Sequence, residues 1–308
     1  MVSAITPSRG CQLTVLRRVD IDAAERFVLA NARLLDRHRL AVLLYGAPVV
    51  PVLDALRAYR NPDGGFGHAL EPDIRAPESE PASTLHALGV LAGVGALADP
   101  MVSDAAAWVA TIAEPDGGVP FVLPTAAASP HAPFLTMPPA GGGSFLTFAL
   151  AGALWEAGSD EPWLTRANDW CWAKLEGPDE LDAYGLKCAL DFLDRVPDQP
   201  RAKAAIERLR SKLGTDGSIP VRGGTEDERL TPLTLSERPG GRSRALFSQD
   251  QIEADLDLLE RGQQDDGGWT FDWLGWSPGQ SVESRGIVTL LALTKLGAHG
   301  RIELPRGD

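Results

Sequence analysis

Gln263-Gln264-Asp265-Asp266-Gly267-Gly268-Trp269 is the sharpest copy of a pattern that runs through the whole chain. Its Asp-Gly-Gly core, or a close relative of it, also begins at Asp63, Asp116 and Asp216. The spacings by subtraction are 53, 100 and 50 residues, so one unit spans about fifty residues. One copy, expected near residues 166 to 177, has degenerated, and six such units would fill the 308 residues.

Each unit has the same internal order: an amphipathic segment, the Gly-rich turn, an irregular loop and a second, more apolar segment. Before the first turn, Val49, Val52, Leu53 and Leu56 fall at i, i+3, i+4 and i+7, which places them on one face of a helix. We expect the glycines to cap the C-terminus of that helix in the left-handed conformation, while the Asp side chain bonds backbone amides. Each unit therefore predicts a helix hairpin.

The segments after the loops are apolar nearly all round, as in residues 83–91, 145–154 and 286–296. A helix without a polar face must be surrounded by other protein, so these helices belong inside a layer of amphipathic ones. We predict an all-α fold: one (α/α)6 toroid domain of about six helix hairpins over residues 1–308, with residues 1–20 as a candidate disordered tail. An open solenoid of stacked helix pairs is the alternative.

The Gln263–Trp269 stretch matches the Gln-x-x-Asp-Gly-Gly-Trp repeat of squalene and oxidosqualene cyclases. The earlier copy at Arg60–Gly67, with the following Pro81–Leu88, resembles the turn and inner helix of protein prenyltransferase β subunits. The resemblance to this terpene cyclase and prenyltransferase superfamily implies a ring of hairpins around a cavity. It implies a structural role for the repeat, whose aromatic residue stacks on the glutamine. It also implies that the loops after the glycines surround the cavity mouth, at the inner-helix N-termini, where acids and anions are stabilised.

The catalytic signatures of that superfamily are missing from the chain. Asp20–Asp22 and Asp255–Asp257 do not continue into the Asp-x-Asp-Asp motif of proton-initiated cyclases, and no Asp-Asp-x-x-Asp magnesium motif is present. Asp169-Trp170-Cys171 has the Asp-x-Cys spacing of a prenyltransferase zinc site, but it lies outside a Gly-rich turn and has no nearby third ligand. The five histidines show no ligand spacing. We therefore expect no metal and no cofactor.

The loop after the first turn, Phe66–Pro81, gathers carboxylates and three stiffening prolines. Crowded carboxylates in a cavity of low dielectric raise the pKa of at least one of them, which makes a general acid. The predicted catalytic acids are Asp73, Glu71 and Glu80. The predicted substrate-binding residues of this loop are Phe66, His68, Arg75 and Glu78. A solvated loop whose acids cap the next helix is the alternative.

The loop after the last turn is rich in aromatic residues. Aromatic faces stabilise a carbocation, and they also stack on sugar rings. The predicted substrate-binding residues here are Trp269, Phe271, Asp272, Trp273, Trp276 and Arg285, and Glu283 is a further catalytic candidate. Packing of the tryptophans against helix ends is the alternative. If the toroid closes, the first and last loops should face each other. A third long loop, residues 120–143, is either a lid or a surface loop.

Composition limits the partners. A net charge of −13 argues against nucleic acid, whose backbone needs a surplus of Lys and Arg. The N-terminus has no secretory signal, no stretch reads as a transmembrane helix, and the three distant cysteines suit a reducing cytosol. We expect a cytoplasmic protein with a small-molecule substrate, with peripheral membrane contact left open.

The leading functional hypothesis is a terpene cyclase-like enzyme that binds an isoprenoid or other apolar substrate and starts cyclisation or rearrangement by protonation. In this reading Arg75 and Arg285 hold charged ends of the substrate. The first rival is a carbohydrate-active toroid, a hydrolase or lyase with Glu80 and Glu283 as its acid and base. The second rival is a binding or scaffold protein that kept the ring without catalysis.

Overall fold

The computed structural model describes residues 19–135, 142–178 and 180–304. Twelve α-helices lie in these ranges, and they alternate between two layers in chain order. The inner helices are α2 (Leu34–Tyr45), α4 (Pro81–Gly93), α6 (Leu146–Glu156), α8 (Ala183–Arg195), α10 (Pro232–Leu235) and α12 (Pro278–Ala298). The outer helices are α1 (Ile21–Asn31), α3 (Val50–Arg57), α5 (Pro100–Ile112), α7 (Trp163–Glu176), α9 (Gln199–Leu209) and α11 (Gln249–Arg261).

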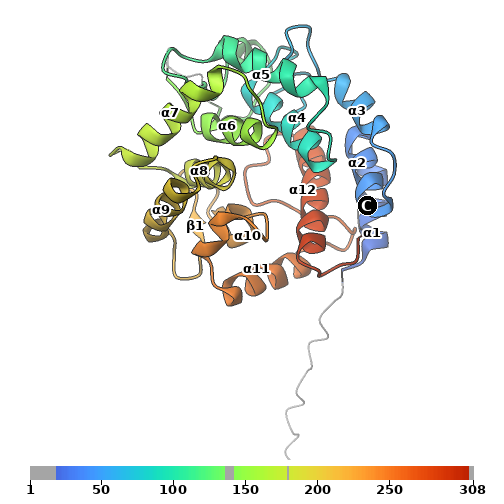
Figure 1. The fold of residues 1–308 in the computed structure, drawn as a ribbon. Coiled ribbons are helices and arrows are strands. Elements are labelled where there is room, and N and C mark those ends of the chain that lie inside the picture. The colour runs from blue at the N-terminus through green and yellow to red at the C-terminus, as the bar shows by residue number, and fades with distance from the viewer. Residues whose placement is uncertain (1–18, 136–141, 179, 305–308) are drawn as a thin grey trace, which may run out of the picture.

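The helices close into a ring (Figure 1). Neighbouring inner helices pack on one another from α4 through α6 and α8 to α10, and α12 packs on both α1 and α2 at the seam. This closure confirms the predicted all-α toroid of helix hairpins and excludes the open solenoid. The single-domain assignment stays a prediction. Of the predicted tail, only Val19 and Asp20 lie within the described residues.

The amphipathic pattern before the first turn is confirmed. In α3, Val52 and Leu56 are fully buried, while Asp54 on the other face is exposed. The apolar inner helices are likewise enclosed: α6 buries most of its length, and its Phe148 packs edge-on against Trp170 of α7 and Phe192 of α8. One core cluster joins inner and outer layers around the ring.

The short elements lie in the loops. Three 3₁₀ helices are η1 (Pro124–Ala128), η2 (Arg210–Lys212) and η3 (Arg242–Leu246). In the loop before α10, β1 (Ile219–Pro220) pairs antiparallel with β2 (Arg229–Leu230). The fifth hairpin is the most irregular, since its inner helix α10 has only four residues.

The four Gly-rich turns have one geometry. In the last turn Asp266 Oδ1 accepts from Gly268 N at 3.2 Å, Gln264 N donates to the Gly268 carbonyl, and Gly267 has φ +93°. Equivalent bonds and a positive φ at the middle glycine recur in the other three copies. The prediction that these glycines cap the preceding helix is wrong. The helix has already ended, as at Arg57 in the first unit, and the left-handed glycine serves the turn itself.

Three of the four turns seat directly on the backbone of the next outer helix. A Cβ on Gly64 would overlap the backbone of Asp104 in α5, one on Gly117 the backbone of Arg166 in α7, and one on Gly267 the backbone of Ala23 in α1. Only glycine permits so close an approach. The turns are therefore the joints between successive outer helices, including the joint that closes the ring.

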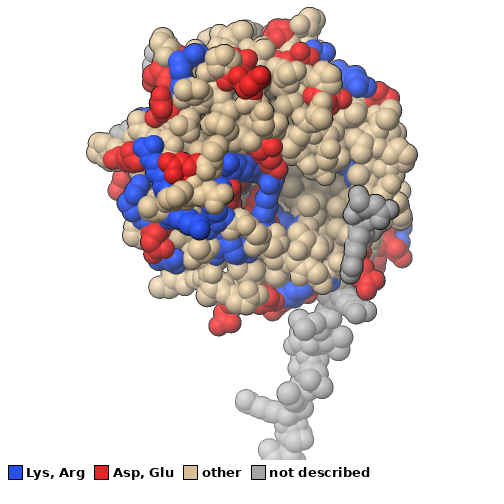
Figure 2. Space-filling view, viewed as in Figure 1, with Lys and Arg blue, Asp and Glu red and all other residues tan. Residues whose placement is uncertain are grey.

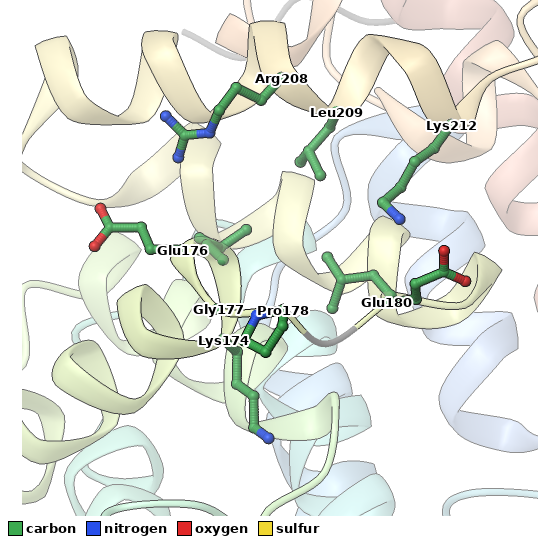
Figure 3. A pocket seen from close by; sticks show the side chains of 10 residues that line it. Lys174, Glu176, Gly177, Pro178, Glu180, Arg208, Leu209 and Lys212 are labelled. Carbon is green, nitrogen blue, oxygen red and sulfur yellow. The ribbon is translucent and has the colours of Figure 1, made fainter.

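The degenerate copy is expected near residues 166 to 177, but α7 continues to Glu176, so this part of the chain forms helix and not a turn, and the chain leaves the helix only at Gly177–Pro178. Here the structure has a surface pocket of about 520 Å³ between the end of α7 and the α9–η2 region (Figure 3). Leu209 and Lys212 form one wall, and Glu176 and Gly177 lie opposite. This pocket belongs to the outer layer, where the other units have a Gly-rich turn. Within the described ranges no helix is both long and apolar enough to cross a membrane.

Candidate active site

The first and last loops meet, as the closed ring predicts. Arg75 of the first loop binds Glu283 of α12 through two hydrogen bonds, of 2.8 and 3.2 Å. Beside them Trp276 Nε1 donates to Asp73 Oδ1 at 3.0 Å. These contacts lie at the N-terminal ends of the inner helices α4 and α12, which is where the resemblance implies a cavity mouth.

The described part of the third loop, residues 120–135, packs on the first loop. Arg75 N donates to the Pro130 carbonyl, and Ala132 N donates to the Asp73 carbonyl, both at 2.9 Å. A small separate core joins the two loops under Trp276; its buried members are Ile74, Ala76, Val122, Ala126, Ala132 and Leu135. The part of the predicted lid at residues 136–141 lies outside the described residues. The described part covers the site from one side.

Asp73 combines access with a raised pKa. Burial and the neighbouring charge of Glu71 raise the pKa of Asp73 to about 6, although Trp276, Gln280 and Arg75 act in the opposite direction. The side chain keeps partial exposure. Gln280 is fully buried beside it, near enough to lower that pKa, yet its Nε2 completes no hydrogen bond within the described residues. The Gln280 amide thus already acts on Asp73 through its proximity, without a hydrogen bond of full geometry.

Glu80 has an even higher pKa but no access. It is fully buried as the N-cap residue of α4. Its carboxylate accepts from Leu123 N at 3.0 Å and from Thr125 Oγ1 at 3.2 Å, so it anchors the third loop. Burial raises the pKa of Glu80 to about 7, against the lowering effect of these two donors. Glu80 makes no side-chain capping hydrogen bond to α4, so it is neither the solvated cap of the alternative reading nor a group that reaches a substrate.

Behind Asp73 lies a chain of paired charges. Glu71 Oε2 is 3.3 Å from His86 Nδ1 on α4. Asp36 of α2, fully buried, binds Arg33 at 2.8 Å and Arg39 at 3.0 Å. Burial opposes ionisation of Asp36, but the two arginines and His86 hold its pKa below the usual range. Asp36 therefore stays a carboxylate, and the acid near neutral pH in this part of the site is Asp73.

An aromatic wall that the sequence analysis missed stands across the site. The rings of Phe121 and Phe145 are 5.0 Å apart, and Phe145 stacks on Tyr184 at 6.2 Å. Tyr184 donates to Glu228 at 2.8 Å, and burial with nearby carboxylates, Asp73 among them, raises its pKa. Phe145 is the N-cap of α6, and Tyr184 lies in the first turn of α8. A search for aromatic residues at the start of every inner helix would therefore have found them.

Five predicted residues lie elsewhere. Phe66 is fully buried in the main core, and Trp269 is nearly so, with its Nε1 donating to the Leu259 carbonyl. Arg285 binds Asp266 of the Gly-rich turn through two 2.8 Å hydrogen bonds. The His68 side chain is exposed and forms a hydrogen bond with the Asn61 side chain, and Glu78 is also exposed. The structure gives these side chains contacts with the core, the turns or solvent rather than with Asp73.

Phe271 and Trp273 form a stacked pair at the rim, with ring centroids 4.7 Å apart. Between them Asp272 is exposed, and its carbonyl accepts from Thr225 of the loop that carries β1 and β2. Among the described residues no three His, Cys, Asp or Glu side chains are grouped to hold a metal ion. Burial raises the pKa of Cys171, the residue with prenyltransferase-like spacing, far above its ordinary value.

Comparison with solved structures identifies the fold. A protein from Actinoplanes matches with a TM-score of 0.55 and 19% identity over 90% of this chain and 99% of that chain. The type II terpene cyclase MstE from Scytonema, in complex with its substrate geranylgeranyl dihydroxybenzoate, matches with a TM-score of 0.53 and 16% identity over 90% and 96%. Its complex with the product merosterolic acid A matches with a TM-score of 0.52 over 92% and 96%.

At these identities the likeness concerns the fold alone. No protein-family model matches the chain, and neither does any curated protein sequence. The chain thus has a terpene cyclase-like toroid, as its repeats imply, and its chemistry has to be argued from its own residues.

Proposed function

We propose that this protein is an enzyme resembling type II terpene cyclases, which protonates a double bond of an isoprenoid in the central hollow with Asp73 as the acid. The observation that carries the proposal is the Asp73 carboxyl: partly buried at the inner-helix N-termini, with its pKa raised to about 6. Such a group is protonated in a useful fraction near neutral pH, yet remains accessible.

In the proposed step the Asp73 proton forms a new C–H bond with one alkene carbon, using the electron pair of the double bond. The adjacent carbon becomes a cation, which later double bonds of the same chain attack. The Asp73 carboxylate left behind keeps the Trp276 N–H bond of 3.0 Å and has beside it the buried Gln280 amide, which already lowers the pKa of Asp73. These donors favour the anion once it forms.

The reaction ends when the final cation loses a proton, so the substrate is isomerised and no proton is consumed overall. The Glu71–His86 pair lies beside Asp73, and we assign to this pair the role of returning the proton to Asp73. The aromatic wall of Phe121, Phe145 and Tyr184 supplies ring faces for cation–π stabilisation, worth about 1–2 kcal/mol per contact when desolvated. MstE, with the same fold, binds a geranylgeranyl substrate, which supports an isoprenoid here.

The carbohydrate alternative finds less support in the positions of its two acids. Glu80 is enclosed by the third loop, and Glu283 is paired with Arg75, so neither presents a free carboxyl to a sugar ring. A non-catalytic scaffold would be expected to fill its centre, whereas the space-filling view shows a central hollow (Figure 2). Neither rival has an observation of its own that favours it.

The test is incubation of the purified protein with prenyl diphosphates, geranylgeranyl dihydroxybenzoate and oligosaccharides, with products analysed by mass spectrometry. Conversion of an isoprenoid to an isomer of equal mass is expected. The Asp73→Asn variant should lose on the order of 10²-fold or more of that rate, as for loss of a general acid. The exposed Asp160→Asn variant serves as the matched control. Full activity in Asp73→Asn would remove the assignment.

A further inference from the structure

Glu228, which lies directly before β2, is a buried carboxyl group without a cation beside it. The residue is only 6% exposed, and no Lys, Arg or His of the described residues forms an ion pair with it. Its neighbour Arg229 lies 3.9 Å from Asp216 instead. Burial of an acid without a cation costs free energy, so such a group is a candidate for a functional role.

Two hydrogen bonds hold the Glu228 carboxyl in place. Its Oε1 accepts from the Tyr184 hydroxyl at 2.8 Å, and its Oε2 accepts from Thr225 N at 3.1 Å. Because both oxygens accept, the group is in its ionised form. A Cβ on Gly224 would come within 2.3 Å of Oε2, so glycine there makes room for the carboxylate. The loop between β1 and β2 is therefore folded around Glu228 and directs Oε1 to the phenol.

Tyr184 lies on the same rim of the central hollow as Asp73. Asp73 accepts the Trp276 N–H, and Trp276 and Phe121 both pack against the small core that joins the first and third loops. From Phe121 the rim continues through Phe145 to Tyr184, with ring centroids 5.0 and 6.2 Å apart. A short, continuous row of contacts thus connects the acid with the phenol.

The rim is also joined from the other side. Thr225, which holds Glu228, donates through its hydroxyl to the Asp272 carbonyl of the last loop. Burial raises the pKa of Tyr184 most, and the charges of Glu228, Asp272 and Asp73 add to the effect. The influence of the Asp73 charge agrees with the row of contacts. The Asp73 carboxyl and the Tyr184 phenol therefore face the same space.

We propose that Tyr184 is the catalytic base that ends the reaction, and that Glu228 is the positioning residue that receives the phenolic proton. The phenol donates its hydrogen to Glu228, so its oxygen can accept a proton from the hollow. A carbon beside a carbocation gives up a proton readily, so a neutral phenol is basic enough when a carboxylate takes its own proton. The inference rests on the proposed function and adds the group that terminates it.

In this step a C–H bond next to the cationic carbon breaks, and its electron pair forms the new double bond. The proton bonds to the Tyr184 oxygen while the phenolic proton moves along the 2.8 Å hydrogen bond to Glu228 Oε1. Tyr184 ends neutral and Glu228 ends protonated. After the product leaves, Glu228 loses its proton to water, and the Glu71–His86 pair supplies one to Asp73. No proton is gained or lost overall.

An acid and a base on one rim limit the kind of product. The carbon protonated by Asp73 and the carbon deprotonated by Tyr184 must lie near each other in the bound substrate. This condition is met by a shift of the original double bond or by closure of a single ring. A polycycle that extends the cation along the whole hollow would carry it away from Tyr184. We therefore infer a double-bond isomer or a monocyclic isomer as the product.

The first test uses the wild-type protein in D2O with geranylgeranyl dihydroxybenzoate and geranylgeranyl diphosphate as substrates. Nuclear magnetic resonance of the product locates the carbon that gained deuterium and the new double bond. We expect one deuterium, placed either in the same ring as the new double bond or beside the position of the original one. A product in which several fused rings separate the two would overturn the assignment of Tyr184.

The second test removes the hydroxyl and keeps the ring. Tyr184→Phe should lower kcat by about 10²-fold with little change in KM, as for loss of a general base, and other isomers or the alcohol formed by water addition should replace the normal product. Glu228→Gln keeps an acceptor for the phenol but removes the charge, so it should change the products in the same direction. Exposed Tyr45→Phe and Glu226→Gln are the matched controls.

A structural role predicts a different pattern. Both variants would then be less stable in urea and slower, but would form the wild-type product, and that result would reject the base. Wild-type kcat and products in Tyr184→Phe would reject it as well. The proposed function fails separately, if the wild-type protein converts neither substrate, and the base is then rejected with it. Conversion by the wild type with unchanged products in both variants rejects the base alone.

Discussion

The carboxyl of Asp73 must be protonated to start the proposed reaction. With a pKa of about 6, its protonated fraction falls about tenfold for each pH unit well above that value. We therefore expect kcat/KM to reach a plateau below about pH 6 and to decline above it. A pH profile with a conversion assay measures this limb.

Replacing Trp276, the hydrogen-bond partner of Asp73, tests the same assignment in a second way. The indole N–H lowers the pKa of Asp73, so removing it in Trp276→Phe should raise that pKa and move the declining limb to higher pH. Trp155→Phe on α6 is a control of the same kind. A limb that stays in place in Trp276→Phe would show that another group sets the profile.

The raised pKa of Glu80 predicts that the stability of the protein, rather than its activity, depends on pH. Its pKa is about 7 in the folded protein and near the ordinary glutamate value of 4.5 when unfolded. As pH rises through this window the unfolded state ionises first, so the free energy of unfolding falls between about pH 4.5 and 7 and levels off above. Chemical denaturation at several pH values should show a shallower decline for Glu80→Gln than for wild type or exposed Glu226→Gln. Equal slopes would contradict the raised pKa.

At the scale of elements, the Gly-rich turns join successive hairpins. A methyl group at Gly267 would strain a backbone at φ +93° and overlap the backbone of Ala23 in α1. Gly300 has φ +69° and open space around its Cβ position, so Gly300→Ala carries only the cost of the left-handed conformation, roughly 1–2 kcal/mol.

We expect Gly267→Ala to destabilise the protein by about 3 kcal/mol or more, because strain and overlap add. Urea unfolding of both variants measures the difference. Equal losses for Gly267→Ala and Gly300→Ala would mean that the turn moves freely away from α1, against its role as a joint.

At the scale of the whole molecule, one glutamine links the two outer helices that meet where the ring closes. Gln263, at the end of α11, accepts from Asp20 N at 2.8 Å and donates to the Asp20 carbonyl at 2.7 Å. Asp20 is the N-cap of α1, so this amide ties the last outer helix to the first. The structural role that the resemblance implies for the repeat takes the form here of two hydrogen bonds between the Gln263 side-chain amide and the Asp20 backbone.

Replacing Gln263 by Leu removes a donor from the buried Gly267 carbonyl and both partners of the part-buried Asp20 backbone groups. The expected loss of stability is about 1–3 kcal/mol per unsatisfied group. Gln264→Leu, at the exposed neighbouring position, should lie close to wild type. Denaturant unfolding, with limited proteolysis near α1, compares the two. A Gln263→Leu protein as stable as Gln264→Leu would show that helix packing closes the ring unaided.

The repeat, its helix hairpins and the toroid followed from the sequence alone. Glycine at turns and apolar residues at helical spacing act locally, and their period is visible without coordinates. The same holds for the expectation that the first and last loops meet, since it needs only ring closure. The predicted capping role of the turn glycine was wrong because the helix ends several residues before the turn. In the first unit α3 ends at Arg57, whereas the glycine with positive φ is Gly64.

Only the tertiary structure separated the candidate acids. Glu80 and Asp73 stand in one loop with similar neighbours, yet the third loop encloses Glu80 and leaves Asp73 accessible. Tyr184 and Gln280 come from segments far apart in the chain. Burial and charge are properties of what surrounds a side chain in space, so the pKa of an acid and the partners of a cation were decided only when the ring closed.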